Sequence, residues 1–426
     1  MMFSRRKFSS LLIGLFCLVA LISTTPALVA SQVETISILM PAPFADSTVK
    51  LVENFNTLYK NQIHLNVIRG PRQTESMSDL AISSLLLGDT PFDGLLMDIT
   101  WLPKYARAGW LEGLDPYFDE TDIADLASGA EKGNDFEGTL YRWPLVADMG
   151  LLFWRTDLMN TPPKTPSELV SISNQLQTQG KVPWGYVWQG RQYEGLSCVY
   201  LEMIDGFGGD WFDVNNQSLG LNEVPGVEAA QWLTDLIETG ISPRAVTTFA
   251  EPEALRNFQS GESAFMRNWP YAWAELQKQD SPVRGKIGIS TMVSLPGVEP
   301  ASTLGSWGFT LLRGSNHKDA VIKAIKYLTS AEAQRVMFIE HGYTPTVKAL
   351  YEDLELIQDY PHLALLSRAL NNAVLRPETP IYAQISDVLQ RSLSASLTGE
   401  EKPKLSMNRA DRSSEQILVA AGGTPS

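Results

Sequence analysis

The stretch MRNWPYAW, residues 266–273, places two tryptophans, a tyrosine, an arginine and an asparagine within eight residues. Aromatic faces pack against the apolar C–H face of a sugar ring, and forked polar side chains bond its hydroxyl groups. The stretch therefore indicates a carbohydrate site. A core helix that happens to contain several rings is the alternative interpretation.

Asp98 and Asp148 are the two carboxylates with which a glycosidase could act, because that reaction needs one acid and one base or nucleophile. The sequence contains no HExxH, GxSxG or P-loop motif. Its histidines have no metal-ligand spacing, and they are His64, His317, His341 and His362. We therefore expect no metal, no cofactor and no enzymatic activity, with a secreted glycosidase as the alternative from another class of protein.

Strands and helices alternate in the segment that contains Asp98. The patterns predict strands at 36–43, 63–69 and 92–99, a helix at 47–59 capped by Asp46 or Ser47, and a helix at 77–89 ending at Gly88. Such alternation is typical of a parallel sheet with helices on both faces, where ligands lie beyond the carboxyl ends of the strands. Asp98 occupies such an end.

A proline-rich segment at 160–170 introduces a second α/β lobe. Strand character returns at 285–297 and 306–313, and helices are predicted at 317–329, at 331–340 and through most of the last eighty residues. A chain of 426 residues is long enough for two domains, each with its own core.

Residues 1–30 have the pattern of an export signal: a basic start, an apolar run at 11–22 and small residues around Ala27 and Ala30. SRRKF at 4–8 fits the beginning of the twin-arginine pattern, and ordinary secretion remains the alternative. No later segment offers about 18 consecutive apolar residues. We expect a water-soluble, periplasmic mature protein.

Cysteine usage and charge exclude further classes. Cys17 lies in the predicted leader and only Cys198 remains, so no internal disulfide is expected. The formal charge is -14, and removal of the three basic residues at 5–7 takes it to -17. Such an acidic chain is an unlikely partner for nucleic acid.

Several stretches resemble one known family, in the family's order and over nearly the whole mature chain. They are MDITWLPKYARAGWLEGLD, YRWPLVADMGLLFWRTDLM, VPWGYVWQGRQYEGL, FQSGESAFMRNWPYAW, STLGSWGFTLL, EHGYTPT and NAVLRPETPIYAQISDVLQ. The chain resembles the trehalose/maltose-type sugar-binding proteins of ABC importers, within the larger family of extracellular solute-binding proteins.

The resemblance implies the type II periplasmic binding protein fold, in which two α/β lobes joined by a multi-crossing hinge close on a sugar in the cleft. We expect an N-terminal lobe at 34–143 plus 291–343 and a C-terminal lobe at 144–290 plus 344–426. The implied partners are a small glycoside and the ABC permease subunits of the inner membrane. We expect the protein to be a monomer.

The resemblance also implies ligand contacts. Asp98 and Asp148 would accept sugar hydroxyls, Trp269 would stack on a sugar ring, Tyr271 would border the same sugar, and Trp273 would belong to the core. The alternatives are structural, because Asp98 could cap a helix before Thr100 and Asp148 could be a turn residue of the hinge.

The remaining expected contacts lie later in the chain or at the edge of the site. Gly305 and Ser306 would bring backbone close to the ligand, Trp307 would supply a second ring, and Arg376 would reach the cleft unless it is a surface arginine. Arg72 and Asp46 are candidates because the loops after the first two strands line the cleft in this fold, and they are weaker ones because these loops align poorly with the family.

Two departures from the family pattern bear on the ligand. Val146 stands where many relatives have an aromatic residue, and Ser306 stands where relatives often have a second glycine, so one ring is lost and one hydroxyl is added. The expected ligand is a disaccharide such as trehalose, maltose or sucrose, with glucosylglycerol as the alternative. A further alternative is that the protein delivers its ligand signal to a sensor kinase and not to a transporter.

Overall fold

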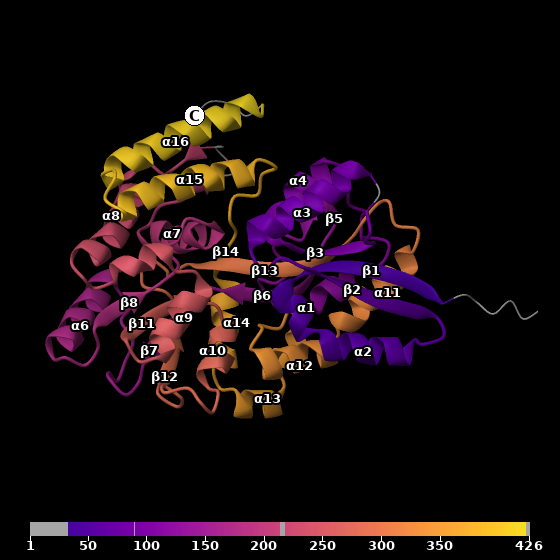
Figure 1. Cartoon of the computed structure of the whole chain (residues 1–426), viewed down its shortest axis with the longest axis horizontal. Helices are drawn as coiled ribbons and strands as arrows, with labels where there is room; N and C mark the ends of the chain where they lie inside the picture. Colours follow the sequence, from indigo (N-terminus) through magenta and orange to yellow (C-terminus); the bar gives the residue numbers. More distant parts are fainter. Residues whose placement is uncertain (1–32, 89, 214–217, 423–426) are drawn as a thin grey trace, which may run out of the picture.

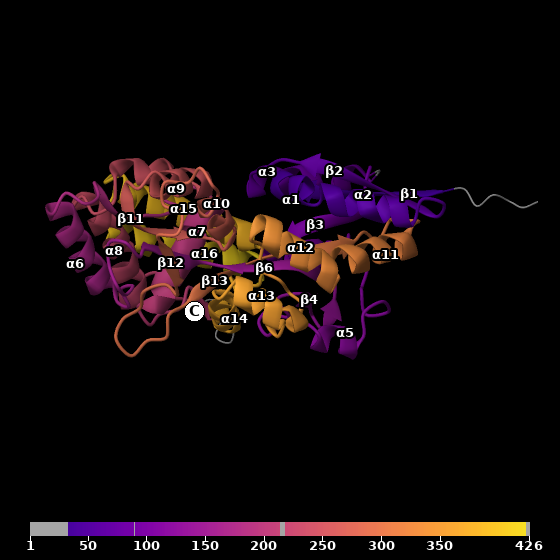
Figure 2. The same ribbon diagram turned by 90° about the horizontal axis from the view of Figure 1, so that it is seen from below.

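The computed structural model describes residues 33–88, 90–213 and 218–422. The chain forms two α/β lobes lying side by side, with long strands running between them (Figures 1 and 2). The predicted export signal lies outside the described residues. No helix in the described part of the chain combines the length and apolar character needed to span a bilayer.

The N-terminal lobe is built on a six-stranded sheet with the order β14-β13-β3-β1-β2, in which β6 also pairs with β13. Its strands are β1 (Glu34–Pro41), β2 (Ile63–Gly70), β3 (Gly94–Asp98), β6 (Trp143–Met149), β13 (Ser302–Leu311) and β14 (Ala373–Val374). β1 is parallel to β2 and β3, as predicted. The sheet as a whole is mixed, because β13 runs antiparallel to β3 and β6.

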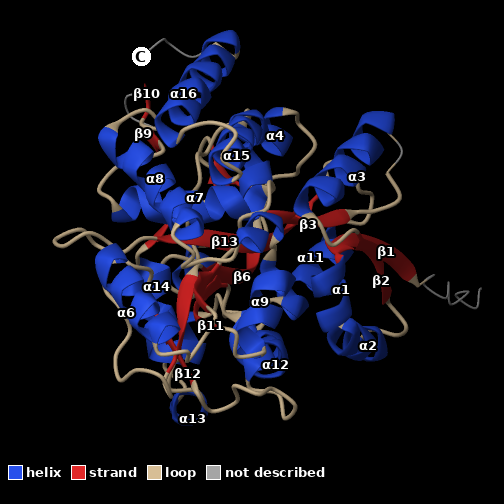
Figure 3. Cartoon of the chain, turned by 60° about the vertical axis from the view of Figure 1, so that its left-hand side comes forward, coloured by secondary structure: helices blue, strands red, loops and turns tan. Residues whose placement is uncertain are grey.

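Helices cover both faces of this sheet (Figure 3), and two short strands, β4 and β5, pair antiparallel with each other. These elements are α1 (Ala42–Ser47), α2 (Val49–Leu58), α3 (Thr74–Leu87), η1 (Ile99–Trp101), α4 (Leu102–Arg107), α5 (Glu120–Ala124), β4 (Asp135–Phe136), β5 (Thr139–Leu140), α11 (Lys318–Leu328) and α12 (Ala331–His341).

The helix predicted at 47–59 is in fact two helices separated at Thr48. The Thr48 hydroxyl donates to the carbonyl oxygen of Phe44 at 2.7 Å, so it bonds back into α1. Thr48 is also the N-cap residue of α2, which has no side-chain cap, and the predicted cap at Asp46 or Ser47 is therefore wrong. The helix predicted at 77–89 begins earlier, at Thr74, and ends before Gly88 as expected.

The C-terminal lobe contains a four-stranded sheet with the order β12-β7-β11-β8. The strands are β7 (Leu151–Arg155), β8 (Trp184–Val187), β11 (Ser263–Asn268) and β12 (Ile287–Ser290). Helices pack around it: α6 (Pro166–Thr178), α7 (Glu194–Gly206), α8 (Val224–Glu238), α9 (Glu251–Gln259), α10 (Tyr271–Leu276), α15 (Tyr382–Leu397) and α16 (Pro403–Ala420). The smaller elements of this lobe are β9 (Phe212–Asp213), β10 (Ser218–Leu219) and η2 (Arg244–Thr248). Three further elements, η3 (Lys348–Tyr351), α13 (Leu354–Asp359) and α14 (Leu363–Asn371), pack together beside the connecting strands, where α14 contacts β6 and β13 and η3 contacts α12.

Three segments connect the lobes: the β6–β7 strand pair, β13, and the chain from β14 to α15. The chain changes sheets at Gly150, between β6 and β7, beyond the boundary expected at residues 143 and 144. A Cβ atom at Gly150 would lie 1.8 Å from Oε1 of the buried Glu202. Glycine is therefore required here, because the backbone passes directly over this carboxylate.

Candidate ligand-binding site

Asp98 is the last residue of β3 and is almost completely buried. The backbone N–H and hydroxyl of Thr100 donate to its Oδ1 at 2.9 and 2.7 Å, so it caps η1. Nη2 of Arg376 also lies 3.0 Å from Oδ1 and 3.2 Å from Oδ2. Asp98 thus has the capping role that was considered as an alternative, together with a buried ion pair that orients its second oxygen.

Arg376 is buried in the chain segment between β14 and α15, so it is not a surface arginine. Its Nη1 donates to Oε1 of Glu194, the first residue of α7, at 2.7 Å. The hydroxyl of Tyr382 donates to the same Glu194 oxygen. One guanidinium group therefore joins a carboxylate of the N-terminal lobe to a carboxylate of the C-terminal lobe.

The strand register places Asp98, Asp148, Gly305 and Trp307 on one face of the sheet. Trp307 of β13 is paired with Asp98 of β3, and Gly305 is paired with Asp148 of β6. Directly paired residues of antiparallel strands have their side chains on the same face, as do residues two apart on one strand. Both predicted carboxylates therefore belong to the same surface.

Trp269 approaches this surface from the C-terminal lobe, just after β11. A Cβ atom at Gly305 would lie 2.7 Å from the six-membered ring of Trp269, so glycine is what allows the indole to come this close. The Arg267 guanidinium lies over the Trp269 ring, 3.9 Å from its centroid. Nε1 of Trp269 donates to Oε1 of Glu251 at 3.2 Å, which fixes the orientation of the half-buried ring.

A buried ion pair supports Arg267. Nε of Arg267 lies 2.9 Å from Oε2 of Glu202, Nη2 bonds Oε1 of the same residue, and both side chains are fully buried. Breaking such a pair leaves an uncompensated buried charge. Glu202, Arg267 and Trp269 thus form a rigid support that holds a ring against the hinge strand.

Asp148 has a different environment from Asp98, because the backbone N–H of Thr344, and not an arginine, donates to its Oδ1, at 3.0 Å. Burial of the carboxyl raises its pKa to about 6, and the Thr344 hydrogen bond opposes this rise. The two predicted carboxylates therefore differ electrostatically, since an arginine neutralises only Asp98.

The raised pKa of Asp148 predicts a pH-dependent stability. The folded protein binds the Asp148 proton more tightly than the unfolded chain does. The protonated carboxyl therefore contributes stability that is fully present below the pKa of the unfolded chain and is lost as the pH rises through about 6. Asp148→Asn keeps an acceptor for Thr344 but cannot ionise. We expect its free energy of unfolding, relative to the wild type, to rise by roughly 2–3 kcal/mol between about pH 4 and about pH 7.5. Urea unfolding at both pH values measures this, and a difference that does not change with pH would contradict it.

Trp307 and Ser306 occupy opposite faces of β13. Trp307 packs against Phe44 and Trp101, with ring centroids 5.4 and 5.5 Å away, and remains partly exposed. The Ser306 hydroxyl is fully buried, accepts from Nη2 of Arg142 at 2.7 Å and donates to the Val146 carbonyl at 2.9 Å. The expectation that this hydroxyl adds a ligand contact is therefore corrected, because strand alternation turns it toward the interior of the N-terminal lobe.

The other predicted residues lie around this cluster. Tyr271 begins α10 and packs against Gly342, at the end of α12. Asp46 and Arg72 lie at the edge on exposed positions. Asp46 pairs with Arg69 at 2.7 Å, and hydrogen bonding to Arg69 lowers the pKa of Asp46. The structure thus brings the strand residues and Trp269 together and leaves Asp46 and Arg72 outside that group.

Six residues that hold the site in place were not predicted from the sequence: Arg142, Glu194, Glu202, Glu251, Arg267 and Tyr382. Arg142 is fully buried, and its guanidinium also bonds the side-chain oxygen of Asn134. Burial lowers the pKa of Arg142 to about 9. The signal that could have found Arg142 and Arg267 is an arginine inside an apolar strand pattern, because such a charge must have buried partners.

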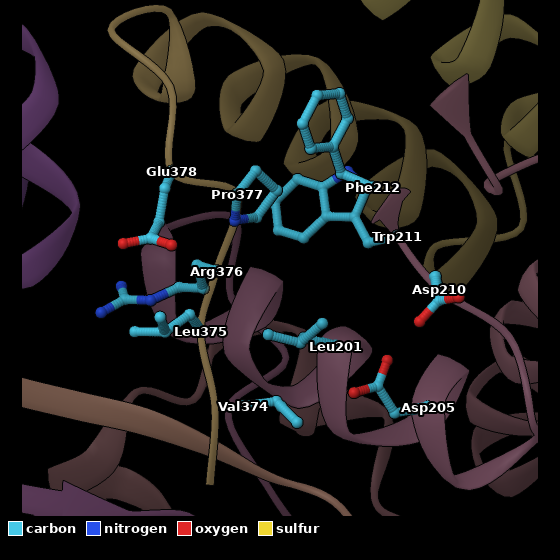
Figure 4. A pocket seen from close by; sticks show the side chains of 10 residues that line it. All are labelled: Leu201, Asp205, Asp210, Trp211, Phe212, Val374, Leu375, Arg376, Pro377 and Glu378. Atoms are coloured by element: carbon cyan, nitrogen blue, oxygen red, sulfur yellow. The ribbon is translucent and has the colours of Figure 1, made fainter. Parts of the chain in front are cut away.

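A cavity of about 160 Å³ lies next to Arg376, between α7, β9 and the segment at 374–378 (Figure 4). In Figure 4 the Arg376 side chain extends away from Asp205 and Asp210, which lie on the opposite side of the cavity. Burial, together with the nearby Asp210 and Glu202 charges, raises the pKa of Asp205 to about 7. The described residues contain no group of three or more His, Cys, Asp or Glu side chains that could hold a metal.

Comparison with known proteins agrees with this architecture. The family model described as "Bacterial extracellular solute-binding protein" matches residues 42–335. A protein named "Probable ABC transporter-binding protein" from Deinococcus radiodurans is 32% identical over 351 residues, covering 80% of this chain and 83% of the relative.

Solved structures share the fold. "Maltose bound T. maritima MalE3" is 32% identical, with a TM-score of 0.85 over 90% of this chain and 100% of that one. A solute-binding protein of Agrobacterium radiobacter K84 in complex with ribitol is 20% identical, with a TM-score of 0.81 over 90% of this chain and 98% of that one. The predicted two-lobed binding-protein fold is confirmed.

These matches also decide between a binding protein and an enzyme. Both the family model and the Deinococcus radiodurans relative are described as binding proteins, so the predicted absence of enzymatic activity is confirmed and the glycosidase alternative is not supported. The chain belongs to the family of bacterial extracellular solute-binding proteins of ABC transporters.

Proposed function

We propose that this protein captures a small neutral glycoside, a disaccharide of the trehalose, maltose or sucrose type, in the periplasm and delivers it to an ABC permease. The observation that carries the proposal is the Trp269 ring, held by Arg267 and Glu251 against Gly305 beside Asp148. A ring face next to carboxylates suits a molecule with apolar C–H faces and hydroxyl edges. The likeness to a maltose-bound structure at 32% identity supports it.

The charge distribution favours a neutral ligand over an anionic one. Asp98 and Glu194 share one arginine, and Asp148 and Glu251 have no arginine or lysine within ion-pair distance among the described residues. A carboxylated or phosphorylated sugar would meet this negative charge. The proposed cargo is therefore uncharged.

Glucosylglycerol, a glycoside with an open-chain polyol part, is the second candidate ligand. Val146, paired with Trp307 next to the site, supplies no ring at a position where the family resemblance implies an aromatic residue in many relatives, so one stacking surface fewer is available. A ribitol-bound relative of the same fold supports testing polyols as well.

Isothermal calorimetry of the mature protein with trehalose, maltose, sucrose, glucosylglycerol, ribitol and glucose tests the proposal. We expect one of the glycosides to bind with a Kd of about 1 µM or tighter, near -8 kcal/mol, and chromatography afterwards to recover it intact. Selective binding of ribitol would replace the glycoside with a polyol. Hydrolysis of any sugar, or the absence of binding to all six compounds, would contradict the proposal.

A further inference from the structure

Glu75 and Glu194 make a polar contact between the two lobes outside the hinge. Glu75 lies in the first turn of α3 in the N-terminal lobe, and its Oε1 accepts the backbone N–H of Glu194, the first residue of α7 in the C-terminal lobe, at 2.9 Å. Glu75 and Glu194 are 119 residues apart in the sequence. The contact can therefore exist only while the lobes are close together.

The N-terminus of α7 needs such a partner. The first N–H groups of a helix have no acceptor within the helix and carry partial positive charge. The N-cap residue of α7, Tyr193, makes no side-chain hydrogen bond to it. The carboxylate of Glu75 thus takes the role of a cap, but it comes from the opposite lobe.

The same residue of α7 is connected to the ligand surface through its side chain. Oε1 of Glu194 accepts from Arg376 at 2.7 Å, and Oε2 accepts from the Ser386 hydroxyl of α15 at 2.9 Å. Arg376 in turn bonds Asp98. In addition, α15 packs against η1, the 3₁₀ helix that follows Asp98.

We propose that Glu75 is a latch that holds the lobes closed by capping α7, and that Glu194 is a positioning residue that links this latch to Asp98 through Arg376. A ligand bonded to Asp98 would steady Arg376 and Glu194, and so the first turn of α7, in the position that Glu75 caps. Opening the lobes separates Glu75 from α7 and leaves the helix end to water.

The test compares Glu75→Ala with Asp79→Ala. Both substitutions remove one carboxylate from an exposed position of α3, one turn apart, but only Glu75 has the contact with α7. Spin labels at Leu58→Cys in α2 and Leu405→Cys in α16 report the distance between the lobes, since both positions are exposed and Cys198 is buried. Maltose is the probe for affinity.

We expect Glu75→Ala to shift the ligand-free distance distribution toward longer distances and to weaken maltose binding about three- to tenfold, mostly through faster release. Asp79→Ala should match the wild type in both measurements. In both measurements Glu75→Gln should lie between Glu75→Ala and Asp79→Ala, because its amide oxygen still accepts a hydrogen bond but carries no charge.

The proposal that Glu75 is a latch would be overturned if Glu75→Ala and Asp79→Ala had the same ligand-free distance distribution, whether both matched the wild type or both were shifted to longer distances. Only the affinity measurement rests on the proposed function. If the wild type binds none of the glycosides in the calorimetry panel, the proposed function fails, and the ligand-free distances still decide whether Glu75 holds the lobes together.

Discussion

Trp269→Ala is expected to weaken glycoside binding by roughly 30- to 1,000-fold, or about 2–4 kcal/mol, the range seen for central aromatic residues of binding sites. Arg267 and Glu251 hold the indole in a fixed orientation, so the ring loses little conformational freedom when a ligand packs against it. Calorimetry with the sugar that the wild type binds measures this loss.

Trp273 offers a matched control, because it is also a tryptophan and lies only four positions further on, within α10. Its ring packs against His362, with centroids 4.4 Å apart, and it joins the buried cluster around Phe338 and Leu363. Trp273→Ala should lower the free energy of unfolding by about 2–4 kcal/mol and change affinity less than threefold. Equal affinity losses in the two variants would place the site elsewhere.

Arg376→Met is expected to lower the free energy of unfolding by about 3–5 kcal/mol, because it leaves the carboxylates of Asp98 and Glu194 buried without their shared cation. Sugar binding should also be lost, since Asp98 would no longer be held in position. Urea unfolding at about pH 7.5 and calorimetry measure the two effects.

Arg391→Met is the control, because the pair of Arg391 with Asp387 is exposed on α15 and should contribute at most about 1 kcal/mol. Adding Asp98→Asn and Glu194→Gln to Arg376→Met removes the unpaired charges and should recover part of the stability without recovering binding. A similar stability loss in the Arg376 and Arg391 variants would show that the buried network is not needed for the fold.

Much of the N-terminal lobe could be predicted from local pattern. Short apolar runs ending at turn residues indicated β1, β2 and β3, and the strand end at Asp98 followed from them. The break at Thr48 could not be predicted in this way, because it depends on one hydroxyl bonding back to Phe44. Periodicity reports which residues are buried but not which hydrogen bonds they make.

The sequence by itself determined the chemistry available: an acidic chain with a cluster of rings at 266–273, carboxylates at strand ends and no metal or nucleophile motif. Only the tertiary structure decided which groups meet. The antiparallel register of β13 places Gly305 beside Asp148 and turns Ser306 inward, and Arg376 reaches Asp98 from 278 residues away. Such pairings arise from long-range packing and charge burial, which leave no periodic signal in the sequence.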